Sequence, residues 1–151
     1  AKQGLEALRA SGSMPFVSRL VEYEGAKYLD GAVSDPIPIQ KALDEGYEKI
    51  VVVLTRPENY KKHREFMPYN LVYHKYPNFV KTAIKQFEDY NKTLELIKQL
   101  ENDGRIVVLR PSKDMKVARV EKNLDKLKAI YQLGVDDCIT NLEKVKTYLA
   151  Q

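Results

Sequence analysis

Two unbroken aliphatic runs constrain the fold of this 151-residue chain more than any other feature. Residues 50–54 read Ile-Val-Val-Val-Leu, and residues 106–109 read Ile-Val-Val-Leu. Short apolar runs bounded by turn signals are typical of strands buried on both faces, which occur mostly in parallel sheets. Residues 80–97, between the two runs, place apolar side chains on one helical face. Buried strands that alternate with helices predict an α/β fold with a partial parallel sheet.

The rest of the chain is predicted to be mainly helical, with one hairpin near the N-terminus. The pattern predicts a helix over 4–10, a hairpin of strands 17–23 and 26–29 joined by Glu24-Gly25, a helix over 39–45, and two final helices separated by Gly134. Two central strands are few for a parallel sheet of this type. We therefore expect further strands of the sheet to lie outside this chain.

Composition excludes several classes of protein. Hydrophobic residues make up 44% and charged residues 30%, which is ordinary for a globular protein and excludes a disordered or fibrous one. The net charge of +4 is too small for a dedicated nucleic-acid arm. The single Cys138, expected to be half-buried on a helix, excludes an internal disulfide and suits a reducing compartment. We therefore expect a cytoplasmic protein.

The pair Asp30-Gly31, taken alone, is a common turn dipeptide. Its surroundings are more specific. An Ala10-Ser11 pair with Pro15 four residues later precedes the hairpin, the hairpin ends in Asp30-Gly31-Ala32, and the strand over 50–54 follows. Over about residues 5–57 this order resembles the second half of the catalytic domain of the patatin-like phospholipases. The sequence over 52–57 is similar to a bacterial subgroup whose remaining C-terminal part is helical.

The resemblance implies a lipid acyl hydrolase, active in lipid degradation, that uses a Ser-Asp dyad without histidine. The aspartate of the family motif corresponds to Asp30, the general base, and the glycine after it to Gly31. A positioned base is needed because a serine hydroxyl is a poor nucleophile until its proton is removed. The implied substrate is a lipid or another ester, and no cofactor or metal is expected. Residues 1–57 would be the C-terminal part of the catalytic domain, and residues 58–151 a helix-rich region of the same globule with one further strand.

The chain departs from the family in one large respect. It contains no Gly-x-Ser-x-Gly, the turn that exposes a nucleophilic serine, and no glycine-rich stretch for an oxyanion hole. In the family both elements precede the part that this chain resembles. We therefore expect this chain to be the C-terminal half of such an enzyme, inactive alone, and either bound to its N-terminal half or self-associated.

Residues 56–76 carry a net charge of +3 and four interleaved tyrosines. One interpretation makes Arg56, Lys61, Lys62 and Arg64 contacts for lipid headgroups at a membrane surface. The other is a solvated loop whose tyrosines cover the core. A rival to the enzyme as a whole is a non-enzymatic α/β module that binds phosphate or nucleic acid through this segment; the enzyme interpretation predicts no nucleic-acid partner. His63 and His74 lack a metal-ligand pattern around them, and no zinc site is predicted.

Overall fold

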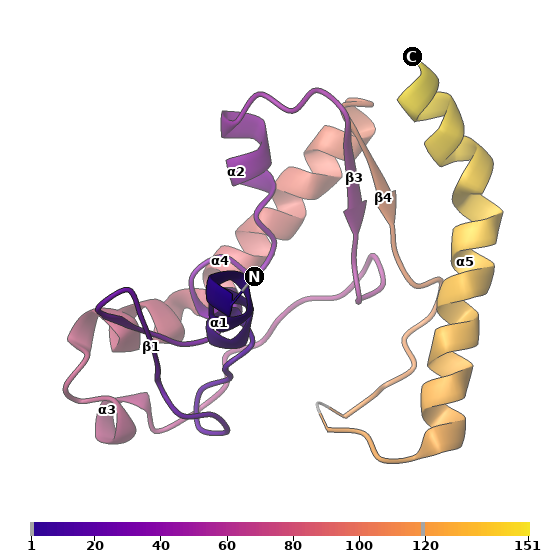
Figure 1. Ribbon diagram of the computed structural model, residues 1–151. Coiled ribbons are helices and arrows are strands. Elements are labelled where there is room, and N and C mark those ends of the chain that lie inside the picture. Colours follow the sequence, from indigo (N-terminus) through magenta and orange to yellow (C-terminus); the bar gives the residue numbers. More distant parts are fainter. Residues whose placement is uncertain (1, 119) are drawn as a thin grey trace. The chain divides into compact units, whose positions relative to one another are not determined.

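The computed structural model describes residues 2–118 and 120–151, which form two compact units (Figure 1). Unit 1 contains the chain up to Pro38 together with Lys62–Thr93, and unit 2 contains Ile39–Lys61 and Leu94–Gln151. The mixture of helices with a hairpin and a parallel strand pair confirms the α/β class. The proposed domain division at residue 57 stays a prediction.

Unit 1 is built around a short hairpin. Helix α1 (Lys2–Ser11) precedes strands β1 (Val21–Tyr23) and β2 (Ala26–Tyr28), which pair antiparallel. The turn between them has positive φ at both central residues, 48° at Glu24 and 78° at Gly25. This is the geometry that matches the right-handed twist of paired strands, so the predicted hairpin is confirmed, with shorter strands. A 3-10 turn, η1 (Gly31–Val33), follows β2.

An aromatic cluster packs the second segment of unit 1, Lys62–Thr93, against the first. Helix α3 (Tyr69–Val72), which the sequence did not predict, leads into α4 (Pro77–Asn102). The ring of Tyr73 lies 5.3 Å from that of Phe16 and 4.8 Å from that of Phe79. Phe16 has a φ of 65°, and its N–H donates to the Tyr73 hydroxyl at 2.9 Å. Tyr73 is buried, so this tyrosine covers the core, as one of the two interpretations of residues 56–76 requires.

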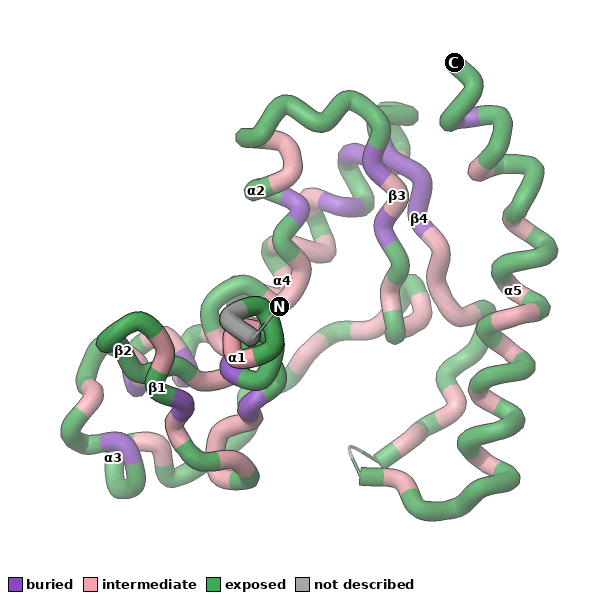
Figure 2. The backbone as a smooth tube through the Cα atoms, in the orientation of Figure 1, coloured by how far each residue is buried: buried purple, intermediate pink, exposed green. Residues whose placement is uncertain are grey.

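Unit 2 contains the predicted parallel pair. Helix α2 (Ile39–Asp44) precedes β3 (Ile50–Val53), which pairs in parallel with β4 (Ile106–Leu109). Figure 2 shows buried positions along both strands and mostly exposed ones along the last helix, α5 (Leu124–Ala150). Ile97, at 1% exposure, is the most deeply buried side chain of the described core. Burial is incomplete at the end of β3, where Val53 is 71% exposed.

Tyr148 ties α5 to the start of both strands. Its hydroxyl donates to the Arg105 carbonyl at 2.6 Å and accepts from the Ile50 N–H at 3.1 Å. The ammonium of Lys49 lies 4.8 Å from the centre of the same ring, in a cation–π contact. One buried side chain therefore satisfies backbone groups that precede or begin both strands.

The prediction of two final helices is wrong, because α5 runs through Gly134 without a break. Glycine in a helix interior costs only about 1 kcal/mol relative to alanine. Two local bonds favour continuity: the side chain of Gln132 donates to Asp136 at 2.8 Å across the glycine, and Asn123 caps the N-terminus by accepting from the N–H groups of Asp125 and Lys126. The expectation of a half-buried Cys138 is also wrong, since this residue is exposed.

Candidate functional site

Asp30 lies between β2 and η1, where the backbone fixes its carboxylate. Its Oδ1 accepts a hydrogen bond from the Ala32 N–H at 2.8 Å, which makes Asp30 the N-cap of the 3-10 turn. Its own N–H donates to the Ser13 carbonyl at 2.8 Å, and its carbonyl accepts from the Val33 N–H at 3.1 Å. The backbone and one carboxylate oxygen of Asp30 are thus both engaged, so the direction of the carboxylate is set locally.

The chain passes close to the end of α1 at Gly31. A Cβ built on Gly31 would lie 3.3 Å from the Ser11 hydroxyl oxygen, which is tighter than most real contacts. The Gly31 carbonyl also accepts from the N–H groups of Ser34 and Asp35, at 3.1 and 2.9 Å. Because a larger residue would press against Ser11, the motif glycine permits the close approach of the two segments.

Two residues that no sequence pattern marks as partners of this turn support it. Ser13 is buried, its hydroxyl donates to the Arg9 carbonyl at 2.6 Å, and its own carbonyl accepts from Asp30. Gln86, on α4, donates to the Ala32 carbonyl at 2.6 Å across 54 residues of sequence. Neither residue type has a pattern that marks it as a long-range partner of a turn, so only the packing of unit 1 reveals them.

Serines lie near this turn, but none is bonded to its carboxylate. In the described part of the chain, no serine hydroxyl forms a hydrogen bond with Asp30. Ser11 faces Gly31 and Ser13 is bonded to the helix, while the Ser34 hydroxyl donates to the Gly31 carbonyl at 3.1 Å. The site as described therefore holds a base-type residue without an adjacent nucleophile.

The four basic residues singled out by sequence fall into both units. Arg56 and Lys61 belong to unit 2, where the Arg56 guanidinium lies 5.0 Å from the centre of the Tyr60 ring and Lys61 is exposed. Lys62 and Arg64 belong to unit 1, with their charged groups 5.3 Å from the ring of Tyr90 and 5.4 Å from that of Phe66. All but Lys61 thus lie over aromatic rings. Their role in substrate binding stays a prediction.

The helices and the acidic and metal-ligating side chains of the described residues, 2–118 and 120–151, bear on membrane insertion and metal binding. Within these ranges no helix is long and apolar enough to cross a membrane. No group of three or more His, Cys, Asp or Glu side chains in the same ranges is arranged to hold a metal ion. His63 and His74 are both exposed, and His74 is hydrogen-bonded through Nδ1 to the Leu71 carbonyl at 3.1 Å.

Two separate parts of the chain are similar to two different protein families. Residues 4–43 match the patatin-like phospholipase family. Residues 76–150 match a domain of unknown function, DUF6363. A stretch of 54 residues is 43% identical to the uncharacterized protein YjjU of Escherichia coli (strain K12). That stretch makes up 35% of this chain and 15% of YjjU, so the match spans a small share of that relative's length.

Proposed function

Since the N-terminal region of this chain is patatin-like phospholipase sequence, we propose that the chain is part of a lipid acyl hydrolase in which Asp30 is the general base of a Ser-Asp dyad. The observation that carries the proposal is the fixed carboxylate. Oδ1 of Asp30 is engaged by the Ala32 N–H at 2.8 Å, and the Asp30 N–H is engaged by the Ser13 carbonyl. The second oxygen, Oδ2, is then the atom that accepts a proton from a serine hydroxyl.

The proposed reaction needs a nucleophile from sequence outside this chain, N-terminal to it. As the serine oxygen attacks the ester carbonyl, its proton passes to Oδ2 of Asp30 and then to the departing alcohol. Water then attacks the carbonyl of the acyl-serine and gives a proton to Asp30, which passes it to the serine oxygen as the acyl–serine bond breaks and the free acid leaves. Gly31 takes part by allowing the turn to lie against Ser11, which keeps Asp30 at the end of the hairpin.

Peripheral contact with a membrane surface from the cytoplasmic side is part of this proposal. Unit 1 exposes four large apolar side chains on one short segment: Phe66 is 89% exposed, Met67 39%, Leu71 77% and Val72 51%. The same segment begins with Arg64, whose guanidinium lies over Phe66. Exposed apolar side chains next to a cation suit the boundary between anionic headgroups and acyl chains.

The test of the dyad is Asp30→Asn in the protein extended through its preceding sequence. The substitution keeps the shape and the Ala32 hydrogen bond while removing the base. We expect ester turnover to fall by about 10²–10⁴-fold, the usual contribution of a general base. Asp35→Asn is the matched control, because Asp35 is an exposed carboxylate that directly follows Ser34, the C-cap of η1. Near-normal turnover in a folded Asp30→Asn enzyme would refute the dyad.

The chain without that extension provides a second test. We expect it neither to hydrolyse esters nor to react with a serine-directed fluorophosphonate probe, because no serine in it has the turn that activates a nucleophile. We also expect oligomers in sizing experiments, since β3 and β4 pair only with each other among the described strands and leave strand edges open. A monomer that labels with the probe contradicts both expectations.

The non-enzymatic alternative, a basic module that binds phosphate or nucleic acid, makes a different prediction about salt. Its affinity for nucleic acid would fall steeply between 50 and 200 mM salt, because counterions are released on binding. Ester hydrolysis does not depend on counterion release. Salt-sensitive nucleic-acid binding by the chain, with no hydrolysis by the extended protein, would favour the alternative.

A further inference from the structure

A cavity of about 370 Å³ lies within unit 2, at the carboxyl ends of β3 and β4. Cavities of about 300–1,000 Å³ are the usual size of small-molecule sites. The carboxyl ends of parallel strands are also where α/β sheets place their ligands. No residue of this cavity belongs to the Asp30 turn, so it is a second candidate site with its own chemistry.

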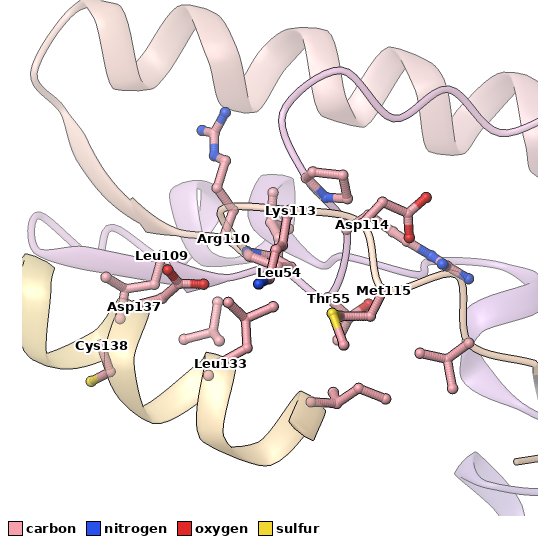
Figure 3. A pocket seen from close by; sticks show the side chains of 17 residues that line it. Leu54, Thr55, Leu109, Arg110, Lys113, Asp114, Met115, Leu133, Asp137 and Cys138 are labelled. Carbon is pink, nitrogen blue, oxygen red and sulfur yellow. The ribbon is translucent and has the colours of Figure 1, made fainter. Parts of the chain in front are cut away.

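Most of the lining is apolar and comes from distant parts of the sequence. Figure 3 shows Leu54, Leu109 and Met115 on one side and Leu133, from α5, on the other. Val53 also lines the cavity and is 71% exposed, although it ends a strand that is otherwise largely buried. An apolar ligand would remove this surface from water, at about 25 cal/mol per Å² buried.

Gly134 contributes open space to the same wall. It lies in the interior of α5, where glycine costs about 0.5–1 kcal/mol relative to alanine. A Cβ at Gly134 would meet no atom within 4 Å, so the packing of the described protein does not require a glycine there. A requirement for open space beside the helix would explain why this position has no side chain.

The charged residues of the lining are unequally engaged. Arg110 pairs with Glu101 and with Glu58, and Figure 3 shows its side chain directed away from Leu133. Asp137 accepts from the Ser112 N–H and Asp114 from the Lys116 N–H, both at 2.9 Å.

Two cations of the lining remain. Arg56 is stacked 5.0 Å from the Tyr60 ring centre, a contact that leaves its N–H groups able to bind an anion. Within residues 2–118 and 120–151, neither Arg56 nor Lys113 forms an ion pair with a carboxylate. The cavity thus combines an apolar wall with two cations that form no ion pair among the described residues, and with two carboxylates, Asp114 and Asp137, whose bonded oxygens are engaged by backbone N–H groups.

We propose that this cavity binds a single-chain carboxylate, with the alkyl chain against Leu54, Leu133 and Gly134 and the carboxylate at Arg56 and Lys113. The apolar wall would bind the alkyl chain of the ligand, and the two cations would bind its carboxylate. The proposal does not depend on Asp30, so binding should survive Asp30→Asn, and failure of the dyad would leave it intact.

The first experiment compares ligands that share a ten-carbon chain and differ in the head. Decanoate, decyl phosphate, decanol and decyltrimethylammonium are titrated below their micelle concentrations, and amide shifts in β4 and α5 are followed by NMR. We expect decanoate to bind more tightly than decanol and the cationic amphiphile not to bind. If decyl phosphate binds more tightly than decanoate, the cations bind a phosphate head group and the proposal of a carboxylate ligand is wrong. Equal binding of decanol would overturn the role of the cations.

The second experiment fills the cavity with Gly134→Leu. Since nothing lies within 4 Å of the new Cβ and leucine favours helix, the variant should fold at least as stably as the original chain. We expect decanoate affinity to fall about tenfold, equivalent to two methylene groups left outside. Lys128→Leu, an exposed position of α5 outside the lining, is the control. Unchanged affinity in Gly134→Leu would overturn the proposed site.

The third experiment removes the charges with Arg56→Gln and Lys113→Gln. Each should weaken decanoate about two- to fivefold, the size of an exposed ion pair, and leave decanol unchanged. Lys128→Gln is the control of equal charge change. If both ligands weaken together, the cations act only through packing and the assignment of the head is wrong.

Discussion

The two units place their candidate sites on different kinds of structure. In unit 1 the carboxylate of Asp30 is held by the N–H of a residue two positions away, and the turn is supported by Ser13. In unit 2 the cavity is formed by strand ends, a loop and α5, and two of its lining residues, Val53 and Leu133, are 80 positions apart in the sequence. A site held by local hydrogen bonds can be predicted from residues that are neighbours in the sequence. A site formed by packing cannot, because it depends on contacts between distant segments.

The units also differ in what stabilises them. Unit 2 is organised by a ladder of aliphatic strand residues and by Tyr148, which bonds to backbone groups at the start of β3 and before β4. Unit 1 relies on aromatic contacts and turns, with Phe16 held at positive φ. We therefore expect the truncation of a buried apolar side chain in unit 2 to cause the largest loss of stability. The removal of a single tyrosine hydroxyl should cause a smaller loss in either unit.

The largest effect is expected from Ile97→Ala. Ile97 is 1% exposed in the core of unit 2, and such truncations cost about 2–5 kcal/mol through lost burial and the cavity left behind. Denaturant unfolding measures the loss, and hydrogen exchange should show it in β3 and β4 more than in the hairpin of unit 1. Ile139→Ala, at a position 66% exposed, should change stability by less than about 0.5 kcal/mol. Equal losses of stability in both variants would contradict the assignment of Ile97 to the core of unit 2.

Tyr148→Phe should cost about 1–3 kcal/mol, because the buried N–H of Ile50 loses its acceptor while the ring stays. Exchange of the Ile50 amide should accelerate more than that of other β3 amides. Tyr131→Phe, also on α5 but 74% exposed, is the control. An Ile50 amide that exchanges as slowly as before would show that the hydroxyl does not tie α5 to β3.

Tyr73→Phe is the corresponding change in unit 1. The ring contacts with Phe16 and Phe79 remain, but the Phe16 N–H loses its acceptor, for an expected cost of about 0.5–1.5 kcal/mol. The loss should appear as faster exchange at Phe16. Tyr28→Phe, at a position 44% exposed, should leave it unchanged. A larger effect than that of Tyr148→Phe would reverse the comparison between the units.

The smallest effect concerns acid at the start of α5. The Asn123 N–H and the Lys126 ammonium, both bonded to the Glu121 carboxylate, hold the pKa of that carboxyl below its ordinary value. A pKa that is lower in the folded state stabilises the fold above the unfolded pKa, and this contribution is lost as pH falls through the folded pKa. The protection factors of amides at the start of α5, which correct for the intrinsic exchange rate at each pH, should therefore fall in acid. In Glu121→Gln this acid-induced change should be absent; if it persists, another group causes it.

Much of the local structure was predictable because the determining residues are neighbours. The hairpin follows from Glu24-Gly25, which adopts positive φ, and β3 and β4 follow from aliphatic runs that can be buried only in a sheet interior. The position of Asp30 after the hairpin is local in the same sense. The fusion of the final helices was not predictable from Gly134, since one glycine costs only about 1 kcal/mol in a helix interior and the Gln132–Asp136 bond spans it.

By itself, the sequence determined the α/β class, the parallel partnership of two aliphatic strands, and an aspartate at the end of a hairpin, because periodicity and turn chemistry act over a few residues. The tertiary structure decided that Gln86 supports the Asp30 turn, that Tyr148 joins α5 to both strands, and that an apolar cavity lies beside Gly134. These hydrogen bonds of Gln86 and Tyr148 join residues from 43 to 98 positions apart. No local pattern specifies such pairs, since each depends on the packing of whole elements against one another.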